Sequence, residues 1–440
     1  MKGPSLRVAL YNAALLAGSP VLASYLAWRV MKGKSRVGWS ERWGELPETM
    51  RPGSVPPMWF HAASVGEVMA ATPVMNALLE RDPECDIVMT TITPGGREVA
   101  EALVGKGIRA AAFLPFDLAP LARRTVGHIG ARLFVGVETE MWPNLLRALT
   151  LTHTPSVLIN ARISDRSFPR YRTVRWLLAE TVRSYDAILA QSERDAERFR
   201  ELGADTERVT VVGNVKFDQA PEPLTAEEAR DLRREFGIDT DAPVWVIGST
   251  RTISEERILW AAHQLARQSL PNLVIIHAPR HTDRADEVAS GMRAAGLEPR
   301  LRSQLSGSGS TRALVLDTFG ELSRVYALAD VAYVGNSLLA PGGGQNPLQP
   351  IAQGKPVLHG PHIGNFRDVM DQAHAAGVVF KVENSRDLAG RLVTLTKDHA
   401  QLEHIRMAGL ALMRANRGAA ARCAEHLAKY KPNPGTAKCS

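Results

Sequence analysis

Short apolar runs alternate with helical patterns along almost the whole chain, and this alternation limits the possible folds more than any other feature. Helical segments between apolar strands are typical of βα units built around a parallel sheet. We therefore predict an α/β protein with two Rossmann-like, doubly wound domains that face a cleft, where ligands bind at the carboxyl ends of the strands. The first series of expected strands lies at 58–62, 86–91, 111–114, 133–138, 156–160, 187–191 and 209–212, and the second at 244–248, 273–277, 313–316, 331–334, 356–358 and 378–382.

A stretch that contains Pro221 and Pro223 separates the two series and is typical of a linker. At 440 residues the chain is long enough to give each domain a sizeable core. The last helices can cross back to the first domain in such a two-lobed arrangement. The expected boundaries are 1–36 for an N-terminal segment, 37–216 for the first domain, 217–242 for the linker, 243–400 for the second domain and 401–440 for the C-terminal helices.

Residues 8–28 carry no charged side chain, while basic residues gather on both sides of them. The net charge is +7, and residues 1–51 hold eight Lys and Arg against three Glu. The uncharged stretch is about as long as a bilayer crossing requires, and the basic cluster behind it favours retention on the cytoplasmic side. We predict a membrane anchor in 1–36 that spans the bilayer or lies in its interface, with the rest of the chain on the cytoplasmic side. A cleaved signal peptide and a buried core helix are the alternatives.

The excess of positive charge beside an apolar segment favours an anionic membrane surface over nucleic acid, and no nucleic-acid-binding motif is present. The three cysteines have no metal or redox spacing. Asp239-Thr240-Asp241 fits a turn better than a metal site, and neither a Walker A motif nor a GxGxxG fingerprint occurs. We therefore predict no metal, no cofactor and no nucleic-acid partner.

The turn after the first expected strand carries the sequence Ser64-Val65-Gly66-Glu67. The carboxyl edge of a parallel sheet is where α/β proteins bind ligands, so Glu67 is a candidate for acid–base chemistry. Ser64 and Glu67 also match a capping box, in which Glu67 returns a hydrogen bond to the Ser64 backbone. Both interpretations stay open on this stretch alone.

Polar clusters follow two further strands of the first domain. Glu138 and Glu140 come after 133–138, and Asn160 and Arg162 come at the end of 156–160, so all are expected on the same edge as Glu67. Converging charges are unfavourable unless a ligand binds there, although helix caps and solvated loops are the alternative. A basic run follows, which can meet phosphates or anionic headgroups or form a solvated helix face; it comprises Arg162, Arg166, Arg170, Arg172, Arg175 and Arg183.

The second domain places polar loops after several of its strands. Arg280 follows 273–277, and Asp317-Thr318-Phe319-Gly320-Glu321 precedes a helix. Arginine and exposed backbone amides suit a phosphate, and the glycines of 342–344 let the backbone approach a ligand closely. Together these loops predict a nucleotide site.

Seven ordered blocks across nearly the whole chain resemble the 3-deoxy-D-manno-octulosonic acid (Kdo) transferases of lipopolysaccharide and lipid A biosynthesis. This resemblance implies a GT-B glycosyltransferase with an N-terminal acceptor-binding domain and a C-terminal nucleotide-sugar-binding domain. The blocks are HAASVGE (61–67), ETEMWPN (138–144), NARISDRS (160–167), GNVKFD (213–218), HAPRH (277–281), DTFGEL (317–322) and GGGQNPLQP (342–350).

The resemblance also implies the substrates and the roles of individual residues. The donor would be CMP-Kdo and the acceptor the acylated, phosphorylated disaccharide precursor of lipid A (lipid IVA). Glu67 matches the general base, and Glu138 and Lys216 match positions that stabilise the transition state. Acceptor or Kdo contacts are expected at Ser64, Gly66, Glu140, Asn160, Arg162 and Arg166. CMP contacts are expected at Pro279, Arg280, Phe319, Gly320, Glu321, Gly343, Gly344, Asn346, Pro347, Leu348 and Gln349.

Two departures from the family pattern concern the donor site. Gln349 stands where the family usually has a glutamate that binds the ribose hydroxyls, and 249–255 differs from the usual Ser-Thr-His-x-Gly-Glu. Two alternatives therefore stay open: a GT-B enzyme that uses another nucleotide sugar, and a membrane-anchored nucleotide-binding protein with little catalysis.

Overall fold

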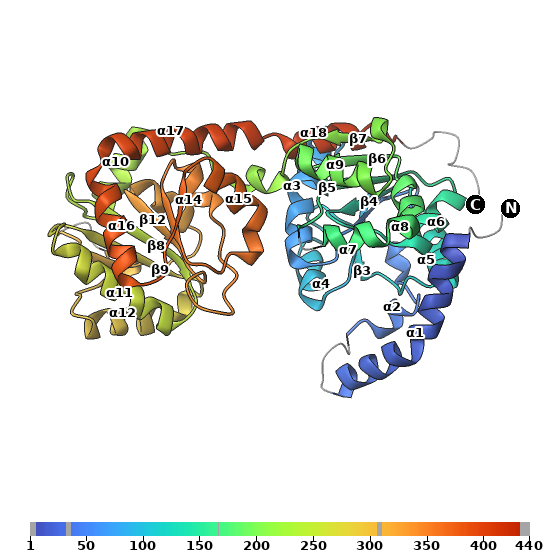
Figure 1. Ribbon diagram of the computed structural model, residues 1–440, viewed down its shortest axis with the longest axis horizontal. Coiled ribbons are helices and arrows are strands. Elements are labelled where there is room, and N and C mark those ends of the chain that lie inside the picture. The colour runs from blue at the N-terminus through green and yellow to red at the C-terminus, as the bar shows by residue number, and fades with distance from the viewer. Residues whose placement is uncertain (1–5, 32–36, 166, 306–309, 432–440) are drawn as a thin grey trace. The chain divides into compact units, whose positions relative to one another are not determined.

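The computed structural model describes residues 6–31, 37–165, 167–305 and 310–431. The chain forms two compact units, Met1–Gln219 together with Asn416–Ser440, and Ala220–Ala415 (Figure 1). The C-terminal residues therefore return to the first unit. Part of the expected linker is helical, because α10 (Ala226–Glu235) begins soon after the two prolines.

The first unit is built on a seven-stranded parallel sheet with the order β3-β2-β1-β4-β5-β6-β7. The strand order reverses between β1 and β4, and the crevice beside such a switch point is where doubly wound sheets bind ligands. His61, the last residue of β1, pairs with Gly136 of β4 and with Thr90 of β2. The strands are β1 (Met58–His61), β2 (Ile87–Thr91), β3 (Ala110–Phe113), β4 (Leu133–Val137), β5 (Ser156–Ala161), β6 (Ala187–Ala190) and β7 (Val209–Val211).

Helices cover both faces of this sheet, which explains why its strands are continuously apolar. Phe60 belongs to the core under α3, α4 and α18, whereas its neighbour Trp59 belongs to the core under α5, α6, α8 and α9. The helices are α1 (Leu6–Met31), α2 (Trp39–Arg42), α3 (Val65–Arg81), α4 (Pro94–Glu101), α5 (Ala119–Ile129), α6 (Pro143–Leu151), α7 (Phe168–Thr173), α8 (Arg175–Arg183), α9 (Glu193–Leu202) and α18 (Ala419–Leu427).

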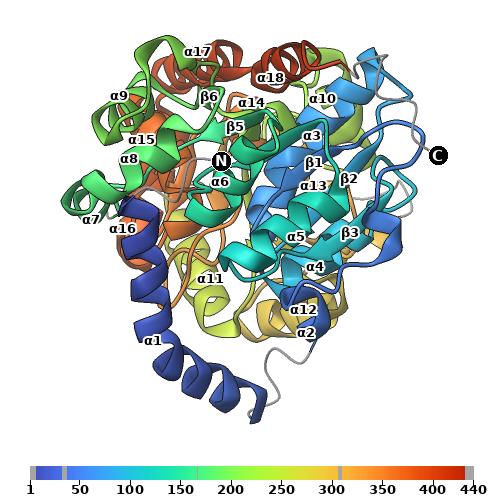
Figure 2. The same ribbon diagram turned by 90° about the vertical axis from the view of Figure 1, so that its right-hand side faces the viewer.

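Helix α1 is attached to the first unit by polar side chains near its start. The Tyr11 hydroxyl donates to Asp117 Oδ2 at 3.0 Å, and the amides of Asn12 and Asn144 exchange hydrogen bonds of 3.0 and 2.8 Å. Figure 2 shows that α1 starts beside α8 and that its other end lies away from the sheet. Within the described part of the chain, no helix has the length and apolarity needed to cross a membrane. The expectation of a spanning anchor is thus not met, and the interfacial alternative stays a prediction.

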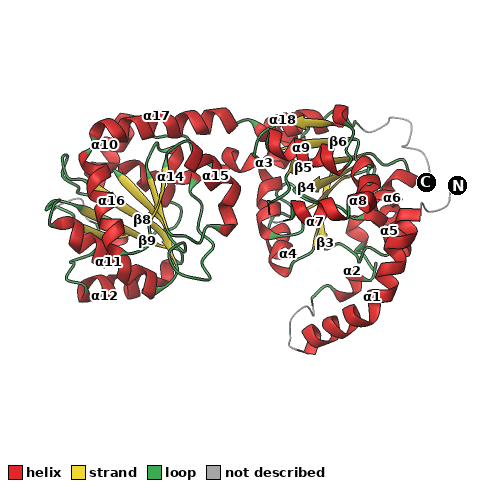
Figure 3. Cartoon of the chain, viewed as in Figure 1, coloured by secondary structure: helices red, strands yellow, loops and turns green. Residues whose placement is uncertain are grey.

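The second unit repeats the architecture with the strand order β10-β11-β9-β8-β12-β13-β14, and all its paired strands are parallel. Its helices flank the sheet, as Figure 3 shows. The strands are β8 (Val244–Thr250), β9 (Val274–Pro279), β10 (Arg300–Leu301), β11 (Ala313–Val315), β12 (Val331–Val334), β13 (Val357–His359) and β14 (Val379–Lys381). The helices are α10, α11 (Ile253–Arg267), α12 (Ala285–Ala294), α13 (Leu322–Val325), α14 (Leu348–Ala352), α15 (Arg367–Ala375), α16 (Ser385–Lys397) and α17 (His399–Asn416).

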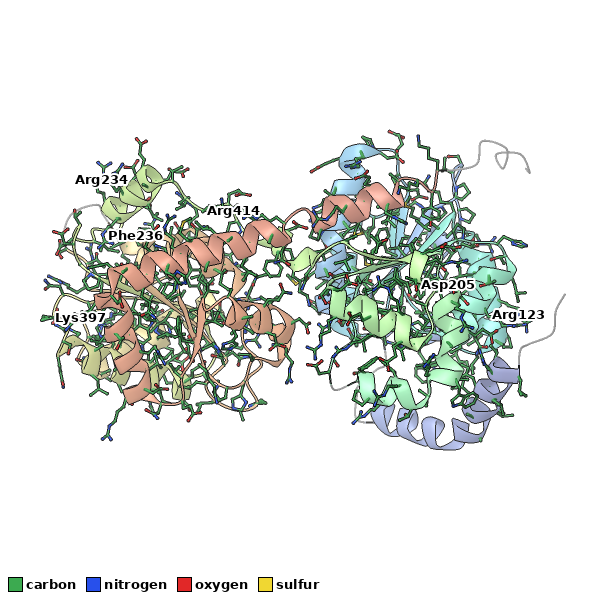
Figure 4. The ribbon with its side chains drawn as sticks, turned by 45° about the horizontal axis from the view of Figure 1, so that its top comes forward. Arg123, Asp205, Arg234, Phe236, Lys397 and Arg414 are labelled. Atoms are coloured by element: carbon green, nitrogen blue, oxygen red, sulfur yellow. The ribbon has the colours of Figure 1, made fainter. Side chains whose placement is uncertain are left out.

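The end of α10 shows how the expected linker becomes part of the second unit. Phe236 follows the last residue of α10 and is fully buried in the core of this unit, whereas Arg234 beside it points to solvent (Figure 4). The guanidinium of Arg302 lies 4.6 Å from the centre of the Phe236 ring. Residues 226–236 therefore belong to the second unit.

Candidate active site

Glu67 lies in the first turn of α3, three residues after the N-cap Ser64. Its Oε2 accepts hydrogen bonds from the backbone N–H groups of Ala63 and Ser64, the latter at 3.2 Å. Among the described residues, Oε1 has no hydrogen-bond partner. The capping box is thus present, and it occupies only one of the two carboxylate oxygens.

Two neighbouring carboxylates act on the charge of Glu67. The pKa of Glu67 is raised from 4.5 to about 7, first by burial and then by the negative charges of Glu140 and Glu138. A carboxylate whose pKa lies near neutral pH is suited to accept a proton in catalysis. With a pKa of about 7, the carboxylate is still deprotonated, and able to accept a proton, in about half of the molecules at pH 7.

Glu138 lies at the centre of a half-buried charged cluster at the same edge of the sheet. Its Oε1 lies 3.0 Å from Lys216 Nζ, and its Oε2 lies 3.6 Å from a guanidinium nitrogen of Arg162. The backbone of Glu138 has a φ of 68°, which is unfavourable for a residue with a Cβ. Residues with such strained backbone conformations are concentrated at functional sites. The structure therefore brings together three of the predicted residues, Glu138, Arg162 and Lys216.

Asn160 supports this cluster by holding the segment that carries Lys216. It is fully buried, and its Oδ1 accepts from the backbone N–H of Val215 at 3.2 Å. Val215 begins the 3-10 turn Val215–Gln219, which carries Lys216. The Asn160 side chain thus holds the segment that carries Lys216, and its contact with the acceptor stays a prediction.

Glu140 is also placed inside the unit. It is only 4% exposed, its Oε2 lies 3.2 Å from His61 Nε2, and the indole N–H of Trp142 donates to the same oxygen. The hydroxyl of Tyr185 donates to the Glu140 carbonyl at 2.6 Å. Oε2 of Glu140 is thus occupied by His61 and Trp142, and the charge of this carboxylate acts on Glu67, whereas its contact with the acceptor or Kdo stays a prediction.

The remaining predicted residues of the first unit carry less information. Gly66 is exposed next to Glu67, and a Cβ built on it would meet only the Ser64 hydroxyl, 3.9 Å away. Arg166 lies outside the described residues. No group of three or more His, Cys, Asp or Glu side chains in the described ranges is placed to hold a metal ion.

A pocket of about 180 Å³ lies in the second unit, at the carboxyl ends of β8, β9 and β11. It contains five predicted donor-binding residues, Pro279, Arg280, Phe319, Gly320 and Gln349. The side chain of Phe319 is 93% exposed, so its ring is free to stack on a planar group. Sequence reasoning missed several lining residues at strand ends or helix starts, namely Ala278, Thr282, Leu316, Leu322 and Ser323.

Other predicted donor-binding residues do not line this pocket. Glu321 lies 3.1 Å from a guanidinium nitrogen of Arg302 and accepts from the Thr318 hydroxyl. Asn346 Oδ1 accepts from the backbone N–H of Leu348 at 2.9 Å. Pro347, Leu348 and Gly344 are buried, and Gly343 packs near Asn365. Their contacts with a donor stay predictions.

Comparison with known proteins identifies the family of this chain. A family model described as 3-deoxy-D-manno-octulosonic-acid transferase (kdotransferase) matches residues 37–219. A 3-deoxy-D-manno-octulosonic acid transferase of Haemophilus influenzae is 32% identical over 426 residues, which cover 96% of this chain and 98% of the relative. The chain belongs to the Kdo transferase family.

Further comparisons agree with this assignment. The Kdo transferase of Bordetella pertussis is 36% identical over 382 residues, covering 84% of this chain and 86% of the relative. A solved glycosyltransferase from Rickettsia africae has the same fold, with a TM-score of 0.52, 12% identity and coverage of 85% of this chain and 98% of its own. The predicted family and the GT-B fold are confirmed, and this Kdo transferase is a glycosyltransferase enzyme.

Proposed function

We propose that this Kdo transferase moves Kdo from CMP-Kdo to the acylated, phosphorylated disaccharide precursor of lipid A, with inversion at the anomeric carbon. The observation that supports this most is the state of Glu67. Its Oε2 is fixed by two backbone amides, its Oε1 has no partner among the described residues, and its pKa is raised to about 7.

In the proposed reaction, Glu67 Oε1 accepts the proton of an acceptor hydroxyl while the hydroxyl oxygen attacks the anomeric carbon of Kdo. The bond between this carbon and the CMP phosphate oxygen breaks, and its electron pair leaves with CMP. The proton on Glu67 then returns to solvent. Burial of the carboxylate favours this step, because a base with a pKa near the working pH accepts a proton more readily than one near 4.5.

The charged cluster around Glu138 would orient the sugar carboxylate. Lys216 and Arg162 both lie against Glu138, and they are the positive charges of this cluster that would meet the sugar carboxylate. In the second unit, Arg280 would stabilise the negative charge that develops on the leaving phosphate. No metal ion is required in this scheme.

The acceptor is a lipid, and one side of the first unit fits a membrane surface on the cytoplasmic face of the inner membrane. The side of α1 that packs on the unit contains buried Val8 and the polar Tyr11 and Asn12, whereas Leu6, Leu10 and Leu16 are 75, 45 and 75% exposed. An apolar outer face on a helix whose polar residues point inward suits the lipid interface.

A basic corner lies where α7 meets α8, and α8 contacts α1 (Figure 2). We name it the arginine corner; its exposed members are Arg170, Arg172 and Arg175. Trp176 beside them is 53% exposed, and tryptophan with arginine is the composition of a membrane-interface contact. We propose that α1 and the arginine corner rest together on anionic lipid.

The test is incubation of the protein with CMP-Kdo and lipid A precursor in detergent, with the products counted by mass spectrometry. Wild type is expected to add Kdo, and E67Q is expected to lose about 100-fold or more of the transfer rate. Glutamine keeps an oxygen that can accept from Ala63 and Ser64, so E67Q removes the base and preserves the cap. E80Q is the matched control, since Glu80 is exposed on the same helix.

Two outcomes would overturn the proposal. Transfer from another nucleotide sugar in preference to CMP-Kdo would favour a different GT-B activity, for which the unusual Gln349 and 249–255 loop are the motivation. Binding of CMP without transfer by wild type, and no change in E67Q, would leave a nucleotide-binding protein.

A further inference from the structure

Glu255, for which no role was predicted, is a buried carboxylate of the second unit that holds a loop in place. Glu255 lies in the first turn of α11 and is 2% exposed. Its Oε1 accepts from the Tyr333 hydroxyl at 2.9 Å and from the backbone N–H groups of Ser337 and Leu338 at 3.0 and 3.1 Å. Its Oε2 accepts from the backbone N–H of Asn336 at 2.8 Å. A carboxylate serves all four donors, whereas a glutamine would turn an NH₂ group toward at least one of them.

The three backbone donors are consecutive, and the conformation of the loop makes them converge. Asn336 follows β12 by two residues and has a φ of 56°, in the left-handed region. Successive N–H groups in such a turn form a concave anion site. In this molecule the anion in that site is the side chain of Glu255.

The same loop holds the glycine segment, residues 342–345, through three hydrogen bonds. The backbone N–H of Gly344 donates to the Asn336 carbonyl at 2.7 Å, and that of Gln345 donates to the Gly335 carbonyl at 3.2 Å. The Asn336 amide nitrogen donates to the Gly342 carbonyl at 3.1 Å. The glycine segment runs on to Gln349, which lines the pocket that contains Arg280.

We propose that Glu255 is a positioning residue of the donor site, which fixes the glycine segment and Gln349 in the shape that binds the nucleotide. The inference rests on the proposed function, because it assumes that this pocket holds CMP-Kdo. The proposal also separates two residues of the unusual segment 249–255. Arg251 is exposed to solvent, whereas Glu255 is buried and makes the contacts that hold the loop.

The role predicts a separation of binding from chemistry. In E255Q the loop loses at least one of its anchoring hydrogen bonds, so the glycine segment samples other conformations. Only a fraction of the molecules then has the conformation that binds the nucleotide. The dissociation constant of CMP and the KM for CMP-Kdo are expected to rise about tenfold, whereas kcat changes less than about threefold. A residue needed only for folding would lower the thermal midpoint and the active fraction without moving KM.

The experiment measures CMP binding by calorimetry and steady-state constants for the full chain. Y333F is the matched control, because it removes one donor and keeps all three loop amides, and its dissociation constant is expected to stay within about twofold of wild type. N336G is the second variant, since glycine accepts the left-handed φ while the bond to Gly342 is lost. It is expected to weaken CMP binding even if E255Q does not fold.

Wild-type affinity for CMP in both E255Q and N336G would overturn the inference, as would a loss of kcat in E255Q with KM unchanged. If wild type binds UDP but not CMP, the proposed function fails, and the same variants titrated with UDP decide the role of Glu255. If wild type binds neither CMP nor UDP, both the proposed function and the proposed role of Glu255 are overturned.

Discussion

Replacing Glu67 with glutamine should stabilise the first unit at alkaline pH while it removes the proposed catalytic base. The folded-state pKa of Glu67 is raised from 4.5 to about 7 by burial and by the charges of Glu140 and Glu138. A group whose pKa is raised on folding contributes its full stability below its unfolded pKa, and that stability is lost as the pH rises through the folded pKa. The negative charge of Glu67 therefore opposes folding above pH 7.

The size of the effect follows from the shift. A rise from 4.5 to about 7 corresponds to about 3 kcal/mol between the protonated and charged forms. Glutamine carries no charge and retains an acceptor for the N–H groups of Ala63 and Ser64. We therefore expect E67Q to be up to about 3 kcal/mol more stable than wild type at pH 8 and nearly equal to it at pH 4, with the change centred between pH 4.5 and 7.

Hydrogen exchange of the β1 and α3 amides, read by mass spectrometry at each pH, reports the opening free energy of this region. E80Q serves again as the control, because Glu80 is exposed and its neutralisation is expected to change little at any pH. An equal stability difference at pH 4 and pH 8, or a variant less stable than wild type at pH 8, would refute the reasoning.

Three further predictions concern the site and the membrane surface. E140Q removes a charge that raises the pKa of Glu67, so the acid limb of the kcat/KM profile should move to lower pH, as a pH–rate series measures. Q349E introduces the acid that the family resemblance implies at this pocket position, where it is expected to bind the ribose, and should lower the KM for CMP-Kdo about threefold to tenfold in steady-state assays. Charge reversal of the arginine corner should weaken binding to phosphatidylglycerol vesicles in flotation at low salt, whereas reversal of exposed Arg230 and Arg234 should not.

The sequence was sufficient for the fold because the strands are apolar on both faces and separated by helical patterns. The strand predicted at 58–62 is observed as Met58–His61, and most others agree as closely. The two-residue strand β10 was missed, since Arg300 and Leu301 form no apolar run. The linker was drawn too long, at 217–242, because two prolines indicated it, although Thr225 and Glu228 form the capping box that begins α10 in the second unit.

The side-chain roles were harder to predict than the strands. A polar residue after a strand can point to the open edge of the sheet or into the unit. Which direction it takes depends on partners from distant segments of the chain. Glu140 is held by His61 of another strand, Asn160 by Val215, and Glu255 by amides about 80 residues later in the chain. Each residue was visible in the sequence, but its burial depended on contacts that no local pattern records.

Glu67 shows why the two interpretations left open by the sequence are compatible. A capping glutamate needs one oxygen directed at the start of its helix, and a general base needs one oxygen that is free to accept a proton. In this chain Oε2 meets the first need and Oε1 is left for the second. The cap also restricts the rotation of the side chain, so the free oxygen is held in one direction before any acceptor arrives. A structural contact at the helix start would therefore also orient the proposed base, and the two roles are compatible in one side chain.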